Sequence, residues 1–300
     1  MKQAWLQQQE RGTVLGMRLI AGFSLLLGRR AGRLVLYPIC LYFMSFMPRG
    51  RRASREYLSR VLGRPSTWCD SFRHFYYFAS TLLDRAFFLS GRNHLFEINK
   101  YGIDVVRDAI DQGRGCLFLG AHLGSFDLMR LSGARKWGLT INMMMYEANA
   151  QKIKRVVESI GCNLHVKVLP IGGMDSLLRA KERLGRGETL AILGDRVTSN
   201  ENTVTVDFLG KKACFPVGPI QAAAALAVPV VIFFGLYRGG NKYEVHFELF
   251  SDRVVLNRKH RQQDLQDAVQ CFATKLEDYC HRAPYNWFNF FDFWKLPGKK

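Results

Sequence analysis

The sequence predicts an α/β protein with a mostly parallel central sheet, helices on both faces of that sheet, and an N-terminal helical arm. Beyond residue 102, helical patterns alternate with short apolar runs, which is typical of strands buried on both faces. Before residue 60, apolar runs are instead flanked by arginines. The 300 residues are 48% hydrophobic and 23% charged, so the chain can bury a sizeable core. A disordered chain, a disulfide-stapled miniprotein and a polytopic membrane protein are excluded.

We divide the chain into a basic, apolar N-terminal arm, residues 1–60, and an α/β domain, residues 61–300. The arm contains two apolar runs of fourteen residues, 14–27 and 34–47. Each would be roughly 21 Å long as a helix, against about 30 Å for the hydrocarbon core of a bilayer. Such runs favour helices that lie in one leaflet. Ordinary buried helices of the globular fold and a single tilted span remain the alternatives.

The charge of the chain is strongly basic and unevenly distributed. Lys and Arg number 43 against 25 Asp and Glu, a net charge of +18, and residues 1–60 hold eleven basic and two acidic residues. This excess suits an anionic phospholipid surface, nucleic acid or an acidic carrier protein. No zinc finger or helix-turn-helix pattern is evident, and the basic residues concentrate beside apolar runs, so nucleic acid is not favoured. Arg49, Arg51, Arg52 and Arg55 are expected to face anionic headgroups on the cytoplasmic side.

The cysteines and glycines predict neither a metal nor a nucleotide cofactor. The seven cysteines are an odd number without a C-x-x-C pair or zinc-type spacing, which favours reduced thiols. No glycine-rich nucleotide loop precedes a helix. The polar N-terminus and the lack of a small-residue cleavage site predict no cleavable signal peptide.

The elements after the arm follow from periodicity and from turn residues. Residues 53–63 and 68–90 are expected to be helices, the second with an aromatic stripe whose default role is core packing. Further helices are expected at 102–112, before Gly113, and at 149–160, 174–184, 217–227 and 262–281. Strands are expected at 116–119, 141–146, 164–169, 189–193, 203–208, 228–237 and 243–250.

The clearest chemical motif is Gly120-Ala121-His122-Leu123-Gly124-Ser125-Phe126-Asp127, which follows a predicted buried strand. Five positions on a regular helix place two side chains on different faces. His122 and Asp127 can therefore meet only if His122 lies in the turn before a helix and Asp127 lies inside its first turn. A carboxylate on one imidazole nitrogen makes the other nitrogen more basic. The motif predicts a general base at the carboxyl end of a strand, where α/β sheets place their sites.

Other candidate residues in the sequence are weaker. Ser125 is not in a G-x-S-x-G context, so a serine hydrolase is not favoured. A lone histidine is more often a satisfied structural residue than a functional one, and this interpretation is kept for the remaining six: His74, His94, His165, His246, His260 and His281.

At H-x4-D, from His122 to Asp127, the sequence resembles the glycerolipid acyltransferase superfamily. The surroundings resemble the lipid A late acyltransferase family, the lauroyl and myristoyl transferases of the bacterial inner membrane. The resemblance covers about residues 12–295 and rests on the stretches 109–127, 186–196, 206–231 and 284–294. Two departures, Tyr146-Glu147-Ala148-Asn149 and the Arg196 that follows Asp195, leave open a divergent branch from an aryl polyene or polyketide-type pathway.

The resemblance implies a membrane-associated O-acyltransferase on the cytoplasmic face of the bacterial inner membrane, without cofactor or metal. His122, oriented by Asp127, would take the proton from a hydroxyl of a lipid acceptor. That hydroxyl would attack an acyl thioester of acyl carrier protein or coenzyme A directly, with no covalent acyl-enzyme. General-base assistance of this kind is worth roughly 10²–10⁴-fold in rate.

Five further residues are expected to bind substrate. Gly124 and Ser125 lie in the motif, where backbone donors near the glycines or the helix N-terminus would stabilise the oxyanion. Asp195 and Arg196 lie at a strand end, and the guanidinium of Arg196 matches phosphate geometry. Lys211 is expected to help for the same reason. A purely structural Asp195–Arg196 pair is the alternative. At the level of function, a catalytically inactive membrane scaffold of the same fold and a thioester or lipid hydrolase remain alternatives.

Overall fold

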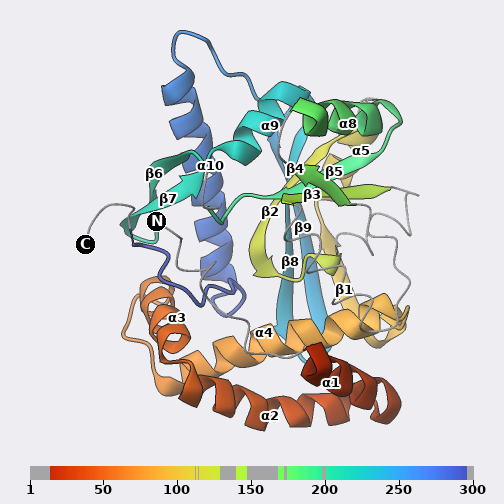
Figure 1. Ribbon diagram of the computed structural model, residues 1–300, viewed down its shortest axis with the longest axis vertical. Helices are drawn as coiled ribbons and strands as arrows, with labels where there is room; N and C mark the ends of the chain where they lie inside the picture. The colour runs from red at the N-terminus through yellow and green to blue at the C-terminus, as the bar shows by residue number, and fades with distance from the viewer. Residues whose placement is uncertain are drawn as a thin grey trace.

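The computed structural model describes residues 14–111, 113, 115–128, 140–146, 168–171, 174–197 and 201–295. Its centre is a seven-stranded sheet in the order β1-β9-β8-β2-β5-β3-β4, and a separate two-stranded sheet is formed by β6 and β7 (Figure 1). All neighbouring strands of the large sheet are parallel except β8 and β9, which form an antiparallel hairpin. The expected α/β class with a mostly parallel sheet is confirmed.

The strands of the large sheet are β1 (Glu97–Tyr101), β2 (Leu117–Gly124), β3 (Ile141–Tyr146), β4 (Val168–Ile171), β5 (Thr189–Leu193), β8 (Val230–Gly239) and β9 (Lys242–Ser251). The small hairpin joins β6 (Thr203–Phe208) and β7 (Lys211–Pro216). The helices are α1 (Val14–Leu27), α2 (Arg29–Phe46), α3 (Pro48–Val61), α4 (Trp68–Leu89), α5 (Ile103–Asp111), α8 (Met174–Gly185), α9 (Gly218–Leu226) and α10 (Arg261–Arg282), with a short 3₁₀ helix at Asn93–Leu95.

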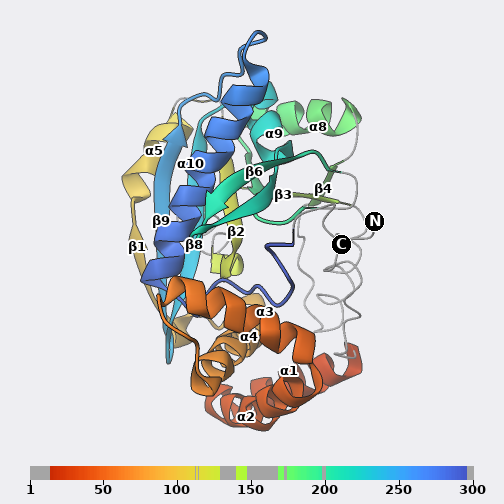
Figure 2. The ribbon, with the colours of Figure 1, turned by 90° about the vertical axis from the view of Figure 1, so that its left-hand side faces the viewer.

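Both faces of the sheet are buried because side chains alternate along each strand. Leu117 and Leu119 of β2 enter the core shared with α8, α9, α10 and the β6–β7 hairpin. Phe118, between them, enters the second core, formed with α2, α4 and α5. Figures 1 and 2 show α10 and the β6–β7 hairpin on one side of the large sheet, with α1, α2 and α4 beneath the lower end of that sheet. This two-sided burial is why the central strands β2, β5 and β8 are mostly apolar, whereas β1 and β9 alternate in burial.

Local signals account for several helix ends. Thr67 and Asp70 form a reciprocal capping box at the start of α4, and Pro48 lies at the first turn of α3. Gly28, at φ 91°, separates α1 from α2. Within the described chain, no helix alone has the length and apolar character of a membrane span, whereas α2 and α3 satisfy that test only together and are bent by 99° at their junction.

The structure also differs from the sequence expectations in places. The strand expected at 116–119 continues to Gly124, and the one expected at 164–169 is described at Val168–Ile171. Strand β1 pairs with β9, which is distant in the sequence, and β7 pairs with β6 across a tight turn. Neither strand was expected, because the side-chain periodicity of each is weak. The helix expected at 149–160 lies outside the described residues.

Candidate active site

His122 lies within β2 rather than in the turn after it. The expectation that the strand ends before His122 is wrong because the last residues of β2 keep backbone partners. The amide of Gly124 donates to the carbonyl of Asn286 at 2.8 Å, and the amide of Phe288 donates to the carbonyl of His122 at 3.1 Å. The C-terminal segment thus lies alongside the end of β2 and holds His122 in an extended backbone.

Strands β2 and β5 are paired only as far as Gly120 and Leu193, and the register of β2 on β8 is irregular between Gly120 and Gly124. Beyond this point the two strands separate. Asp195 follows β5 by two residues, and its carboxylate enters the space beside His122. Separation of neighbouring strands at their carboxyl ends is the usual origin of sites in parallel sheets.

Asp195 accepts three hydrogen bonds that fix the imidazole of His122. Its Oδ1 atom lies 2.8 Å from Nδ1 of His122, while its Oδ2 atom accepts from the backbone amide of His122 at 3.1 Å and from Nε1 of Trp287 at 3.0 Å. The side chain of Asp195 is 1% exposed and that of His122 is 33% exposed. Because an ionised carboxylate can only accept, Nδ1 carries the proton and Nε2 presents its lone pair.

The protonation states suit a base at neutral pH. Burial disfavours the charged carboxylate of Asp195, but His122, Arg196 and Trp287 outweigh this and lower its pKa to about 2. Burial, aided by the positive charge of Arg196, lowers the pKa of His122 below its ordinary value, although Asp195 acts in the opposite direction. The imidazole is therefore neutral at pH 7 and next to a fixed negative charge.

Asp127, the expected partner of His122, lies elsewhere. It begins the helical segment after β2, and its Oδ2 atom lies 3.2 Å from Nε of Arg85 on α4. Among the described residues, no hydrogen bond or ion pair joins Asp127 to His122. Since β2 continues past His122, the two residues do not share one turn, and the structure gives the orienting position to Asp195.

Arg196 lies next to Asp195, as the sequence suggested. Its Nη2 atom donates to the carbonyl of Phe288 at 3.1 Å, and its guanidinium lies 5.6 Å from the ring centroid of Phe291. Burial lowers the pKa of Arg196, with Asp195 opposing, but an arginine remains charged at pH 7. Its remaining donors and its charge make it a candidate anion-binding group beside His122.

The sequence reasoning missed Trp287 and Asn289 as individual site residues. Trp287 is 1% exposed and ties the C-terminal segment to Asp195. The side chain of Asn289 is buried, and neither of its amide atoms has a hydrogen-bond partner in the described structure. A buried, unsatisfied amide is costly, which makes Asn289 a candidate contact for a bound group. The aromatic stretch 284–294 was the sequence signal for both residues.

Gly124 and Ser125 shape the backbone beside His122. The amide of Ser125 donates to the carbonyl of Gly235 at 2.7 Å, and Ser125 is 4% exposed. Gly124 has φ +69°, and a Cβ there would collide with the carbonyl of Gly235. The amides of both residues are already used, so they are not free donors for an oxyanion. Their contact with substrate remains a prediction.

Lys211 lies away from this cluster in the described structure. Its Nζ atom lies 3.4 Å from Glu56, so it joins the β6–β7 hairpin to α3. No contact between Lys211 and His122 is present among the described residues, and its role in substrate binding remains a prediction.

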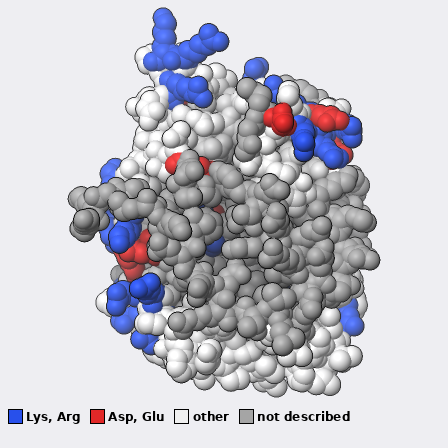
Figure 3. Space-filling view, viewed as in Figure 1, with Lys and Arg blue, Asp and Glu red and all other residues white. Residues whose placement is uncertain are grey.

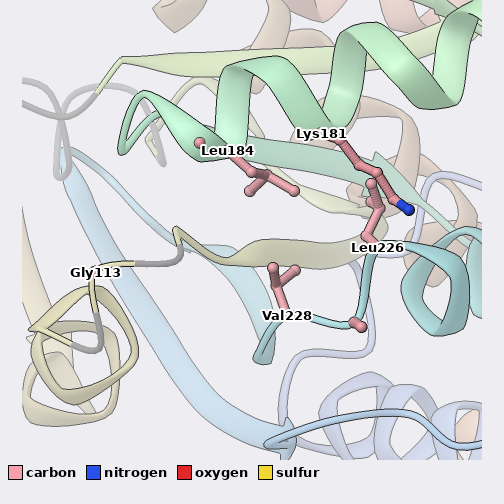
Figure 4. A pocket seen from close by; sticks show the side chains of 7 residues that line it. Gly113, Lys181, Leu184, Leu226 and Val228 are labelled. Atoms are coloured by element: carbon pink, nitrogen blue, oxygen red, sulfur yellow. The ribbon is translucent and has the colours of Figure 1, made fainter.

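A pocket of about 290 Å³ lies at the opposite end of the sheet, where β2 and β8 begin (Figure 4). Its described lining is largely apolar, including Leu184, Leu226 and Val228, and Lys181 is the one charged residue in that part of the lining. The described lining contains no histidine, carboxylate, hydroxyl or thiol side chain, so this pocket is not the candidate active site. No cluster of metal-ligating side chains occurs among the residues described here.

Comparison with known proteins identifies the family of the chain. A family model described as bacterial lipid A biosynthesis acyltransferase matches residues 15–296, nearly the whole chain, including His122, Asp195 and the C-terminal segment that joins them. A search of curated proteins found no match. The protein belongs to the bacterial lipid A biosynthesis acyltransferase family and is an acyltransferase.

Proposed function

We propose that the protein is a membrane-associated O-acyltransferase that moves a fatty acyl group from a thioester to a hydroxyl of a lipid acceptor. Membership of the family implies an acyl donor and a lipid acceptor. The proposal adds acyl carrier protein or coenzyme A as the carrier of the thioester and the cytoplasmic face of the bacterial inner membrane as the location. In it, residues 1–60 associate with the membrane and residues 61–300 carry out the transfer.

The contact between His122 and Asp195 carries the proposal. A neutral imidazole with Nδ1 hydrogen-bonded to a carboxylate and Nε2 available is the arrangement needed for general-base catalysis. The side chain of His122 is one-third exposed, so a substrate hydroxyl can reach it. Asp195 is ionised and fixed by three donors, which favours the imidazolium that forms when His122 takes a proton.

The transfer then takes place in a single encounter between acceptor and donor. Nε2 of His122 takes the proton of the acceptor hydroxyl, and the oxygen forms a bond to the thioester carbonyl carbon. The carbon–sulfur bond breaks, and the proton on His122 passes to the departing sulfur. Because proton, acyl group and thiol are all accounted for, no covalent acyl-enzyme and no cofactor is needed.

Arg196 is proposed to bind negative charge next to the reacting centre. Its guanidinium lies close enough to His122 to lower the pKa of that imidazole. The same position suits the oxyanion of the addition step or a phosphate of either substrate. Arg196 is therefore the main candidate for stabilising the oxyanion. The amides of Gly124 and Ser125 are less suitable, because they already have backbone acceptors.

The experiment is transfer of labelled acyl groups from an acyl-carrier thioester into a total lipid extract, with purified wild type, His122→Ala and Asp195→Asn compared in detergent. We expect label in a specific lipid with wild type only. His122→Ala should lose at least about a thousandfold and Asp195→Asn about a hundredfold in rate, with unchanged circular dichroism. An active, folded His122→Ala protein would contradict the mechanism.

The same assay separates the alternatives. Label recovered only as free fatty acid indicates a hydrolase instead. Absence of turnover with both carrier-protein and coenzyme A thioesters indicates a scaffold or an acceptor that the extract lacks. A scaffold and a missing acceptor are distinguished by adding lipid from a strain that contains the protein's own pathway. Turnover that appears on this addition indicates a missing acceptor.

A further inference from the structure

Helix α2 has two faces of opposite kind. Gly32, Leu36, Cys40 and Met44 recur every four residues and are buried against the body of the protein. At 100° per residue, Leu34, Leu41 and Tyr42 lie on the opposite face, and Tyr37 and Phe46 lie at its two edges. All five side chains are exposed. Leu34 is 70% exposed and Phe46 is 58% exposed. A long apolar face left uncovered on one side of a packed helix marks an interaction surface.

Helix α1 and the start of α4 enlarge this surface. Exposed Leu19, Phe23 and Leu26 follow one side of α1, which packs beside α2. Trp68 at the start of α4 is 54% exposed and is connected to Tyr37 of α2 through a stack on Phe72. Exposed tryptophan and tyrosine at the edge of an apolar surface are typical of the membrane–water interface. We call the exposed side of α1 and α2 the α1–α2 face.

Arginines frame the α1–α2 face, and acids are absent from it. Arg30 is exposed at the start of α2, and Arg49, Arg52 and Arg55 are exposed on α3 just beyond its end. Between residues 14 and 55 the sequence contains no Asp or Glu. In Figure 3 the lower end of the molecule is white, and basic side chains gather to its left. This pattern complements an anionic headgroup layer above a hydrocarbon interior.

The α1–α2 face is held rigidly against the catalytic domain. Nε and Nη2 of Arg29 each lie 2.6 Å from a carboxylate oxygen of Asp84 on α4, and Asp84 is completely buried. The hydroxyl of Tyr243 also donates to Asp84 at 2.7 Å. Both Arg29 and Arg33 donate to the carbonyl of Gly240 at the tip of the β8–β9 hairpin. Helix α2 is therefore fixed across the end of the domain at its first turn.

The junction of α2 and α3 also restricts how the α1–α2 face can lie on a flat surface. The chain bends by 99° there, so α3 leaves the direction of α2 immediately after Phe46. The buried face of α2 packs against α4 and α1, so its other face is turned away from the body of the protein. A flat surface can cover this face along its full length while α3 and its arginines remain at the headgroups.

We propose that the α1–α2 face inserts into a single leaflet of an anionic bilayer, with α2 parallel to the membrane plane and both of its ends on the same side. The active site then lies just above the lipid. Helix α4 lies between α2 and the carboxyl end of β2 (Figure 1), and its Arg85 contacts Asp127 of the motif. The inference rests on the membrane association in the proposed function but not on the acyl-transfer chemistry.

The first test measures binding of the full chain to vesicles of phosphatidylethanolamine and phosphatidylglycerol. The double variant Leu34→Asp/Leu41→Asp should bind at least about tenfold more weakly, because two leucine side chains no longer insert into the lipid. Val255→Asp is the matched control, since Val255 is also 70% exposed but lies in the loop before α10, and it should bind like wild type. Equal binding of Leu34→Asp/Leu41→Asp and wild type would overturn the proposal.

The arginines are tested in the same way. Arg49→Glu/Arg52→Glu should weaken binding about tenfold on vesicles with phosphatidylglycerol and little on phosphatidylcholine alone. Arg258→Glu/Lys259→Glu, in the exposed loop before α10, is the control and should have no effect. If the α1–α2 face instead joined two copies of this chain, the leucine variant would change the sedimentation mass in detergent and leave vesicle binding intact.

The second test addresses orientation. Arg30→Cys and Arg52→Cys are treated with a membrane-impermeant maleimide in inside-out and right-side-out native membrane vesicles, and labelling is measured by peptide mass spectrometry. Both sites should label in inside-out vesicles and neither in right-side-out vesicles. Labelling of either site from the opposite side would show that α2 spans the bilayer. Acyl transfer in detergent should be unchanged in the leucine variant, which separates failure of this inference from failure of the proposed function.

Discussion

Nδ1 of His122 lies 2.8 Å from Oδ1 of Asp195, although 73 residues separate them in the chain. The contact exists because β5 lies beside β2 in the sheet and ends just before Asp195. Trp287 completes it from the C-terminal segment by donating to the second carboxylate oxygen. Three distant parts of the sequence thus fix the orientation of one neutral imidazole.

The Asp127–Arg85 pair should act as a unit that positions the segment after β2. We expect Asp127→Asn, Arg85→Gln and the double variant to reduce the rate by similar factors, because each breaks the same 3.2 Å contact. A double-mutant cycle on kcat and KM measures this. If the two effects simply multiplied, Asp127 would act independently of Arg85, as expected of a residue that orients His122 directly.

The rate of transfer should fall at acidic pH, and this acidic limb of the pH profile should reflect protonation of His122. Burial and Arg196 lower the pKa of His122, so activity should persist below pH 6.5 and fall only when Nε2 becomes protonated. Arg196→Gln removes a charge that disfavours imidazolium, so its limb should move to higher pH. Profiles of kcat/KM against pH check this. A limb that moves to lower pH in Arg196→Gln would refute the electrostatic assignment.

Buried His74 should make the fold sensitive to mild acid. Its Nδ1 and Nε2 atoms each lie 2.9 Å from a partner, Ser54 and the carbonyl of Trp287, and burial lowers its pKa to about 4. Because this pKa is below the unfolded value, protonation favours the unfolded chain. Stability is complete above pH 6.5 and should fall by about 3 kcal/mol as the pH approaches 4. The free energy of unfolding, measured in urea at several pH values, should depend less on pH in His74→Gln than in the wild type.

Removal of the Asp84 carboxylate should destabilise the attachment of α2. Asp84→Asn leaves the largely buried guanidinium of Arg29 without its counter-charge, which typically costs about 3–5 kcal/mol. Asp104→Asn is the matched control, because the pair of Asp104 with Arg107 is exposed and should change stability by less than about 0.5 kcal/mol. If the urea midpoints of Asp84→Asn and Asp104→Asn were nearly equal, the Asp84–Arg29 pair would not be important for stability.

Gly124 and Gly113 allow conformational strain to be separated from collision. Both have similar positive φ, +69° and +71°. A Cβ at Gly124 would collide with the carbonyl of Gly235, whereas a Cβ at Gly113 would meet no atom of the described residues within 4 Å. Gly113→Ala should cost about 1–2 kcal/mol. Gly124→Ala should cost clearly more and should lower activity by displacing the end of β2. Thermal unfolding and the transfer assay measure both effects.

Much of the fold was predictable because its signals are local. The run 14–27 and the strands 141–146, 189–193 and 203–208 have the bounds expected from periodicity alone. Strands β1 and β7 were not predicted. Their pairing with β9 and β6 depends on backbone partners, and their side-chain patterns are only half buried.

For the candidate site, the sequence alone was enough to place a glycine-framed histidine near the end of one buried strand and an Asp-Arg pair just after another. Which carboxylate meets the imidazole depends on the three-dimensional fold. That choice depends on the order of β2 and β5 in the sheet and on the C-terminal segment, which keeps β2 extended through His122. Sequence spacing measures proximity along one helix or turn, whereas strand order and segment packing are set by burial across the whole chain.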